Sequence, residues 1–202
     1  SLTPVNDPSQ FGIVETNADG RVLPFVEKPQ PGETNSRFAS AGTYVMEEST
    51  LALMPGTEKL SIERVTFPQL VAEGALFAMA TDDYWIDAGR PDTYVQANND
   101  IATQLRNPAD AAVHASAVIA GSAVVRDAVI SANVNVGENA QVSNSVLLNG
   151  AVIGSGAAVE RSIVMGNVRS DARIVDCIVG PTGVVQSGQI STGGRFPEGE
   201  IS

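Results

Sequence analysis

Glu27, Lys28 and Pro29 form a short segment that could bind a phosphorylated sugar. They follow an apolar run, residues 22–26, that is typical of a β-strand. A lysine at a strand end is a compact cation suited to a phosphate, and a neighbouring glutamate can accept hydrogen bonds from sugar hydroxyls. The chain has only one other lysine, Lys59. Taken alone, an exposed Glu–Lys ion pair is the simpler interpretation.

A second segment whose residues could take part in binding or catalysis is Trp85-Ile-Asp87-Ala-Gly89, which runs into Pro91. An aspartate beside a glycine can bind Mg²⁺ through its carboxylate, because the glycine lets the backbone come close to the ion. Taken alone, Asp87 is more simply a turn or helix-capping residue. Trp85 is expected in the core or in the wall of a site.

The elements that must position these segments are predicted from periodicity and turn residues. Asp19-Gly20 predicts the turn of a hairpin over residues 11–27, and Pro91 suits the first turn of a helix. We expect further strands at 38–46 and 75–80, a short helix at 50–54 capped by Ser49, a helix capped by Ser61 that runs to Gly74, and an amphipathic helix at 94–105.

The second half of the chain has a repeat of about 17 residues. Aliphatic residues return at intervals of six, six and five, as in Val136, Val142 and Leu147, then Ile153, Val159 and Val164. Gly, Asn, Asp and Ser lie between them and suit tight corners, whereas a helix would need apolar residues at a period of 3.6. The pattern resembles the hexapeptide repeat of the left-handed parallel β-helix over residues 113–192. One spacing of 15 predicts a shortened corner near 166–170.

The hexapeptide β-helix is found with several functions, so it does not define one. Acyltransferases use a histidine base, some carbonic anhydrases bind zinc through three histidines, and some sugar nucleotidyltransferases carry the helix as an appendage. The single histidine, His114, excludes three-histidine zinc ligation within one chain. It leaves acyl transfer open, although His114 stands at the start of the repeat and is more simply a solvated linker residue.

The amino-acid composition limits the kinds of binding partner and the cellular location that we expect. The net charge is −11, most of it in residues 1–110, and neither half has a basic stripe, which disfavours nucleic-acid binding. There is no apolar run long enough for a membrane span and no signal peptide, so we expect no membrane association and a cytoplasmic location. The one cysteine, Cys177, fits a reducing compartment and is expected to be a buried thiol.

Together, the two segments and the repeat resemble sugar nucleotidyltransferases, most closely mannose-1-phosphate guanylyltransferase-like proteins with a C-terminal left-handed β-helix. The motifs occur in the family's order over nearly all of residues 1–192. They are Phe11-Gly12, Val26-Glu-Lys-Pro29, Ser40-Ala-Gly-Thr-Tyr44, Ser61-Ile-Glu-Arg64 with Phe67-Pro68, and Trp85-Ile-Asp-Ala-Gly-Arg-Pro91. The resemblance implies an α/β nucleotidyltransferase portion over residues 1–110 and a β-helix over 111–202.

The resemblance also implies the reaction, in which a sugar 1-phosphate attacks the α-phosphate of an NTP and gives an NDP-sugar and pyrophosphate. The expected NDP-sugar is GDP-mannose. It implies Mg²⁺ as cofactor, with Asp87 as one of two metal-binding aspartates, and Lys28 as the residue that holds the sugar phosphate. The implied sugar-binding residues are Glu27, Gly12, Ser40 and Gly42. The family usually has asparagine where this chain has Ser40, which has a shorter reach.

The family's Gly-rich loop, which binds the NTP phosphates, has no counterpart in this sequence, and neither does its first metal-binding aspartate. We therefore expect this chain to contain only the sugar-phosphate side of the active site and to be inactive alone. We also expect an apolar face of its sheet to be exposed unless another polypeptide segment covers it. A homo-oligomer is expected. The alternatives are a non-catalytic regulatory or oligomerisation subunit and a hexapeptide acyltransferase.

Overall fold

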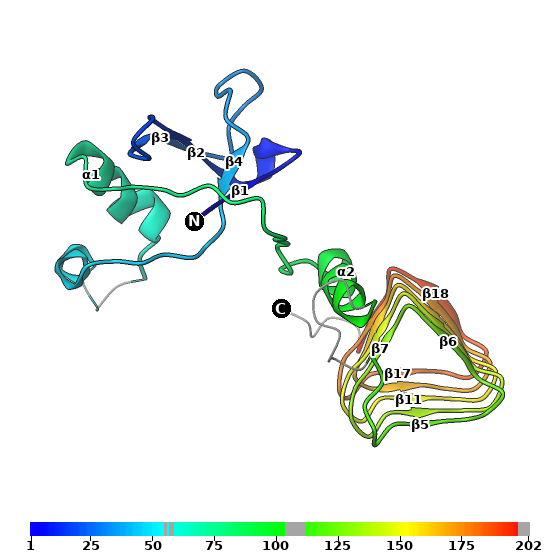
Figure 1. The fold of residues 1–202 in the computed structure, drawn as a ribbon. Coiled ribbons are helices and arrows are strands. Elements are labelled where there is room, and N and C mark those ends of the chain that lie inside the picture. The colour runs from blue at the N-terminus through cyan, green and yellow to red at the C-terminus, as the bar shows by residue number, and fades with distance from the viewer. Residues whose placement is uncertain (55, 57–58, 104–111, 198–202) are drawn as a thin grey trace. The chain divides into compact units, whose positions relative to one another are not determined.

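The computed structural model describes residues 1–54, 56, 59–103 and 112–197, without the side chains of Pro24, Phe25 and Glu27. The chain divides into two compact units, Ser1–Trp85 and Ile86–Ser202 (Figure 1). The domain boundary predicted between residues 110 and 111 lies outside the described residues. Within the described ranges, every helix is too short or too polar to cross a lipid bilayer.

The first unit contains a four-stranded antiparallel sheet in the order β1-β4-β2-β3. Its strands are β1 (Leu2–Pro4), β2 (Gly12–Thr16), β3 (Val22–Glu27) and β4 (Phe38–Ser40), and the 3₁₀ turn η1 (Pro8–Gln10) precedes β2. The predicted hairpin is confirmed as β2 and β3. Its turn is stabilised by the Asn17 side chain, whose Oδ1 accepts hydrogen bonds from the backbone N–H groups of Asp19 and Arg21.

The helical segments of this unit differ from the predicted ones. They are η2 (Glu48–Leu53), η3 (Ile62–Thr66) and α1 (Phe67–Ala72). The first begins at Glu48 rather than after Ser49, and Ser61 makes no side-chain capping hydrogen bond. Ile62–Thr66 is a turn of π-helix, which places Pro68 at the start of α1, where its missing N–H costs nothing.

The strand predicted at 75–80 is wrong as a continuous element. This segment makes only isolated bridges, Leu2 with Ala80 and Arg21 with Phe77. Its alternate residues Leu76 and Ala78 pack on the small core formed by Leu2, Val14 and Val22. Its backbone still hydrogen-bonds to neighbouring strands, with Val22 N donating to Leu76 O and Leu2 N donating to Met79 O, each at 2.9 Å, so the pairing is strand-like but interrupted.

The second unit begins with helix α2 (Pro91–Ala102), which has proline in its first turn as predicted but starts before Tyr94. Its Val95 packs against Val146 and Ile163 on the outer surface of the following solenoid. Leu105, the predicted end of this helix, lies outside the described residues. The helix thus covers one side of the solenoid.

The solenoid is the predicted parallel β-helix, with three sides around an aliphatic interior (Figure 1). Its sheets have the orders β19-β16-β13-β10-β7, β17-β14-β11-β8-β5 and β18-β15-β12-β9-β6. The strands are β5 (Val118–Ile119), β6 (Val124–Arg126), β7 (Val129–Ile130), β8 (Asn135–Val136), β9 (Gln141–Ser143), β10 (Val146–Leu147), β11 (Val152–Ile153), β12 (Ala158–Glu160), β13 (Ile163–Val164), β14 (Asn167–Val168), β15 (Arg173–Val175), β16 (Ile178–Val179), β17 (Val184–Val185), β18 (Ile190–Thr192) and β19 (Arg195–Phe196).

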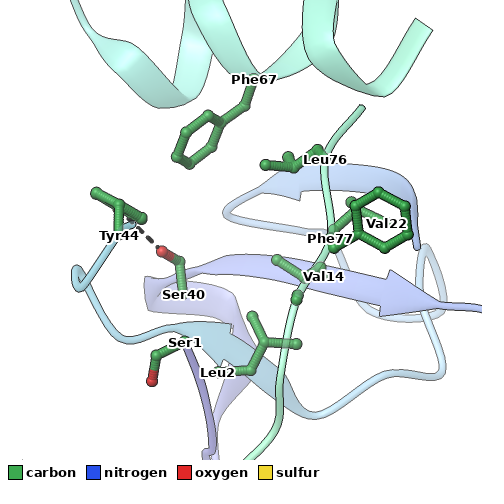
Figure 2. A pocket seen from close by; sticks show the side chains of 10 residues that line it. Ser1, Leu2, Val14, Val22, Ser40, Tyr44, Phe67, Leu76 and Phe77 are labelled. Carbon is green, nitrogen blue, oxygen red and sulfur yellow. Dashed lines mark hydrogen bonds between the residues drawn. The ribbon is translucent and has the colours of Figure 1, made fainter. Parts of the chain in front are cut away.

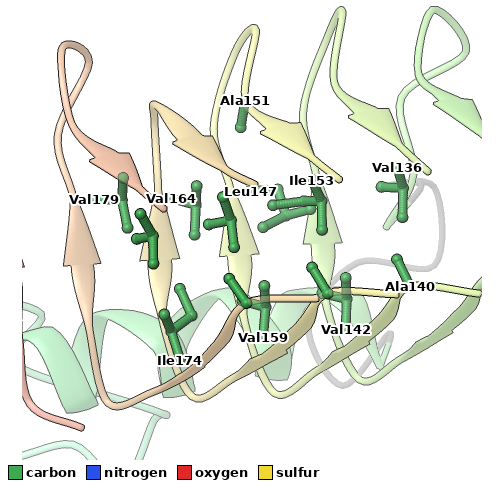
Figure 3. Packing of buried hydrophobic residues seen from close by; sticks show 14 of the residues in the cluster. Val136, Ala140, Val142, Leu147, Ala151, Ile153, Val159, Val164, Ile174 and Val179 are labelled. Carbon is green, nitrogen blue, oxygen red and sulfur yellow. The ribbon is translucent and has the colours of Figure 1, made fainter. Parts of the chain in front are cut away.

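The inward aliphatic residues of the central coils form ladders inside the helix and are almost fully buried, whereas Ile119 and Val125 of the first coil are only partly buried. Figure 3 shows Val136 and Ile153 stacked on one side and Val142, Val159 and Ile174 on another. Adjacent coils share the same register, so each methyl group packs on its equivalent in the next coil. This stacking explains why the period could be read from the sequence.

The coil predicted to be short is short at Met165 and Gly166, the beginning of the predicted range. Val146 pairs with Ile163, 17 residues on, whereas Ile163 pairs with Ile178, 15 residues on. Only two residues separate β13 from β14, while the next corner, residues 169–172, has the usual four. A Cβ atom at Gly166 would lie 2.3 Å and 2.4 Å from the carbonyl oxygens of Gly183 and Gly180. The tight corner therefore requires glycine.

Cys177 continues a column of buried hydroxyl groups at another corner. Ser145 Oγ accepts from Ser162 N, and Ser162 Oγ accepts from Cys177 N, each at 3.0 Å. Each side chain also donates to a backbone carbonyl two residues earlier, and for Cys177 this is Sγ to Val175 O at 3.2 Å. Cys177 is 1% exposed, in agreement with the predicted buried thiol.

We expect Cys177→Ser to change the free energy of unfolding by less than about 1 kcal/mol, because a hydroxyl can donate to Val175 O as the sulfur does. Ser162→Ala is the matched comparison and should lower it by about 1–3 kcal/mol, since the Cys177 N–H would lose its acceptor. Urea unfolding of both variants measures the difference. Equal losses of stability would contradict the hydroxyl column.

Candidate functional site

Three predicted site segments meet at one edge of the sheet in the first unit. The antiparallel order places the start of β2 beside the ends of β3 and β4. Gly12 pairs directly with Glu27, and Ile13 pairs with Ala39, the residue before Ser40. Residues that are far apart in the sequence therefore line the same edge. The backbone of Glu27 is part of this edge, while its side chain lies outside the described part of the structure.

Lys28 turns the chain sharply at the end of β3. Its φ of 53° is in the left-handed region, which is uncommon for a residue other than glycine. Its backbone N–H donates to Phe11 O at 3.0 Å, which holds the turn against the start of β2. Such strained positions persist where the surroundings fix them, and they cluster at functional sites. The Lys28 side chain is exposed and available to an anion.

Trp85 contacts both the segment that follows β4 and the residue that precedes β2. Its indole Nε1 donates to Ala41 O at 3.2 Å, and its ring meets that of Phe11 edge to face, with the centroids 5.8 Å apart. Gly42 follows with φ of +74° and open space where a Cβ would lie, so its conformation rather than crowding favours glycine. The prediction that Trp85 forms core or wall agrees with these contacts.

Ser40 is the first member of a hydrogen-bonded chain. Ser40 Oγ lies 3.1 Å from the Tyr44 hydroxyl, which donates to Glu63 Oε1 at 3.0 Å. Because the single phenolic proton goes to Glu63, Ser40 must donate to Tyr44, and its oxygen keeps acceptor capacity for a ligand hydroxyl. Burial raises the pKa of Tyr44, and the Glu63 carboxylate raises it further, so the phenol stays protonated at neutral pH.

The cavity beneath Ser40 and Tyr44 is not a sugar site. Figure 2 shows it lined by Leu2, Val14, Phe67 and other mostly apolar side chains. Its volume is about 40 Å³, far below the roughly 300 Å³ of a small-molecule pocket. Tyr44 also packs edge to face on Phe67, with the ring centroids 5.0 Å apart. The cavity is therefore part of the packing that fixes Tyr44, and Ser40 lines its wall.

Asp87 belongs to the second unit, where it forms a turn. Its Oδ1 accepts from Gly89 N at 2.9 Å, and the residue is exposed. Among the described residues, no group of three or more His, Cys, Asp or Glu side chains could hold a metal ion. A single exposed carboxylate suits Mg²⁺, which keeps most of its waters and binds through one or two carboxylates together with substrate phosphates. Asp87 thus fits as one ligand and not as a complete site.

Tyr44 and Glu63 are members of this region whose roles the sequence reasoning missed. Both stand in the quoted motifs, but nothing in their spacing of 19 residues predicted a hydrogen bond between them. Phe11 was noted only as the neighbour of Gly12, and the structure gives it two contacts, with Lys28 N and with Trp85. The only sequence signal for these contacts was the presence of an aromatic residue, Phe11 or Tyr44, within the motifs that contain Gly12 and Ser40.

Comparison with known families agrees with this architecture. Residues 1–104 match the nucleotidyl transferase family, and residues 93–180 match the GlmU-like C-terminal hexapeptide family. The first match covers more than half of the chain. The chain therefore belongs to the nucleotidyl transferase family, with a hexapeptide β-helix following the nucleotidyl transferase portion.

Individual proteins similar to this chain include two mannose-1-phosphate guanylyltransferases and a GlmU protein. A mannose-1-phosphate guanylyltransferase of Mycobacterium tuberculosis is 34% identical over 102 residues, which is 50% of this chain and 28% of that protein. A probable mannose-1-phosphate guanylyltransferase 3 of Arabidopsis thaliana is 35% identical over 52% of this chain and 31% of its own length. A bifunctional protein GlmU of Methanococcus maripaludis is 26% identical over 62% and 31%. The chain spans about a third of the length of these relatives.

Proposed function

We propose that this chain forms the sugar-phosphate side of a sugar-1-phosphate nucleotidyltransferase. In the complete protein, mannose 1-phosphate and GTP would give GDP-mannose and pyrophosphate. The observation that carries the proposal is the convergence of Gly12, Glu27, Lys28 and the Ser40–Gly42 segment on one strand edge. The names of the relatives support the reaction type and favour mannose over other sugars.

The roles proposed for these residues follow from their chemistry. The exposed Lys28 ammonium would hold the sugar phosphate, and its fixed backbone would limit the entropy lost on binding. Ser40 Oγ would accept from one sugar hydroxyl, and the Glu27 carboxylate from another. Gly12 and Gly42 would let the backbone approach the sugar. Asp87 would bind Mg²⁺, whose charge in such sites neutralises the transferring phosphates.

The nucleotide side would come from chain outside these 202 residues, in the same polypeptide or in a companion. The sequence has no Gly-rich phosphate-binding loop. The first unit exposes large apolar side chains, at Leu23 and Phe38 on the strands of the sheet and at Val45, Leu51, Phe77 and Met79 outside it. These two features support the view that the chain is inactive alone.

We expect Lys28→Gln in the complete protein to raise the KM for mannose 1-phosphate about 10- to 100-fold, because a charge-assisted phosphate contact is lost. The KM for GTP should stay within about twofold, since the lysine would contact only the sugar phosphate. Lys59→Gln is the matched control and should change neither value. A Lys28→Gln enzyme that loses affinity for GTP alone would contradict the assignment.

The two alternative functions have less support. For acyl transfer, His114 would have to be a free base, yet its Nδ1 accepts from Ser116 N at 3.1 Å and lies 2.9 Å from Ser116 Oγ, as a turn residue does. For a regulatory or oligomerisation subunit, substitutions at Lys28 and Asp87 would leave the activity of the assembly unchanged. The kinetic comparison above separates that function from catalysis.

A further inference from the structure

The three outer sides of the β-helix differ in what they carry. Helix α2 covers the side formed by β7, β10 and β13. The side formed by β6, β9, β12, β15 and β18 bears charged residues such as Arg126, Glu160 and Arg173. The outward residues of β5, β8, β11, β14 and β17, here called the neutral face, bear none. In a chain with a net charge of −11, an uncharged face is where two copies can meet with least repulsion.

The neutral face has a symmetric pattern. From β5 to β17 its outward residues are Val118, Asn135, Val152, Asn167 and Val184. Val118 is 63% exposed and Val152 is 40% exposed, although both are aliphatic. The order is the same in both directions about Val152. A second copy turned end over end would therefore place valine against valine and asparagine against asparagine.

The corner beside this face adds charge complementarity. Glu138 lies in the corner that follows β8, and Arg169 lies in the corner that follows β14. These corners stand one coil to either side of β11, which carries Val152. Asp171 shares the corner with Arg169, where its Oδ1 lies over Gly156. Glu138 and Arg169 thus lie in two corners that are symmetric about Val152, at neighbouring positions within them, and carry opposite charges.

We propose that the neutral face is the interface between two copies of this chain, related by a two-fold axis that runs parallel to the strands through Val152. Val152 then packs on its equivalent, Asn135 meets Asn167 of the partner subunit, and Glu138 meets Arg169 of the partner subunit. A two-fold axis along the solenoid would instead reverse the strands of the partner, so that each of these corners would meet an uncharged corner and neither charge would be paired. The charges therefore select the antiparallel arrangement.

The size of the neutral face sets the strength of the dimer. Five strands spaced about 4.8 Å apart and sides of about 20 Å give about 500 Å² per copy. A total of about 1,000 Å² is at the lower limit for a specific interface, so we expect a dissociation constant in the micromolar range. The dimer does not depend on the proposed enzymatic function.

Sedimentation velocity of the 202-residue chain from about 1 μM to about 500 μM tests the interface. The chain should shift from monomer to dimer, and Val152→Lys, which opposes two ammonium groups on the axis, should remain monomeric. Val124→Lys is the matched control, since Val124 is 44% exposed on the charged side, and it should dimerise normally. A chain that stays monomeric throughout, or equal behaviour of the two lysine variants, would overturn the proposal.

Charge reversal tests the orientation. Arg169→Glu should weaken the dimer about 10-fold, because it opposes two carboxylates at each end of the interface. Combining it with Glu138→Arg should restore the affinity, since the opposite charges are again paired. An unchanged affinity of the single variant, or no recovery in the double variant, would contradict the antiparallel axis. Circular dichroism melting confirms that each variant is folded.

Discussion

Replacing Asp87 by asparagine in the proposed complete enzyme should lower kcat for the proposed GDP-mannose formation by about 10²- to 10³-fold, the usual loss when one electrostatic stabiliser is removed. The substitution separates the two interpretations of this residue. Asparagine keeps an oxygen to accept the hydrogen bond from Gly89 N, so a turn role predicts full activity. A metal-binding role predicts the loss, together with a higher Mg²⁺ concentration for half-maximal rate.

The rate is measured as pyrophosphate release at saturating substrates over a range of Mg²⁺ concentrations. Asp82→Asn is the control, because Asp82 is an exposed carboxylate in the same stretch of chain with no proposed role. Undiminished turnover of the Asp87 variant would refute its assignment as a metal ligand. The strand-edge assignment of Lys28 would stand independently, since it rests on contacts within the first unit.

Replacing Gly166 by alanine should destabilise the β-helix by about 3 kcal/mol, near the upper end for overpacking. The added methyl group would lie 2.3 Å and 2.4 Å from two backbone carbonyl oxygens of the next coil. Neither can move without breaking the ladder, because Gly183 O also accepts from Asn167 N and Gly180 N donates to Phe196 O. The corner between β13 and β14 has only two residues, so its backbone cannot move away from these oxygens without displacing a strand.

Gly121→Ala is the matched control in the same solenoid, since a Cβ there meets nothing within 4 Å. It should be neutral or stabilise by up to about 1 kcal/mol, because alanine restricts the unfolded chain. Thermal unfolding followed by circular dichroism measures both variants. Similar melting temperatures for the two would show that the short corner is not constrained as its geometry indicates.

The β-helix was readable from the sequence because its contacts repeat. Each coil packs on the next in the same register, so the period of 17 appears directly as Val136 and Ile153 or Val142 and Val159. The exact place of the short corner was less accessible. Aliphatic spacing locates the deletion only between two inward residues, and the structure resolves it at Met165 and Gly166.

The candidate site was predicted by residue type and motif, while its geometry was not. A contact such as Trp85 Nε1 to Ala41 O joins residues 44 apart, and no periodicity encodes such a pair. The Ser40–Tyr44–Glu63 chain has the same character, since it depends on the π-helical turn that follows Ser61. Local patterns predict elements, and long-range side-chain bonds need the fold.

Titration of mannose 1-phosphate into the 202-residue chain, followed by two-dimensional NMR, tests the central claim that this chain holds the sugar-phosphate side. We predict saturable shifts with a dissociation constant between about 0.1 and 10 mM, centred on the amide groups of Gly12, Lys28 and Gly42. Lys28→Gln should abolish them, Lys59→Gln should retain them, and inorganic phosphate should bind more weakly. The absence of saturable binding, or binding that Lys28→Gln leaves unchanged, would contradict the claim.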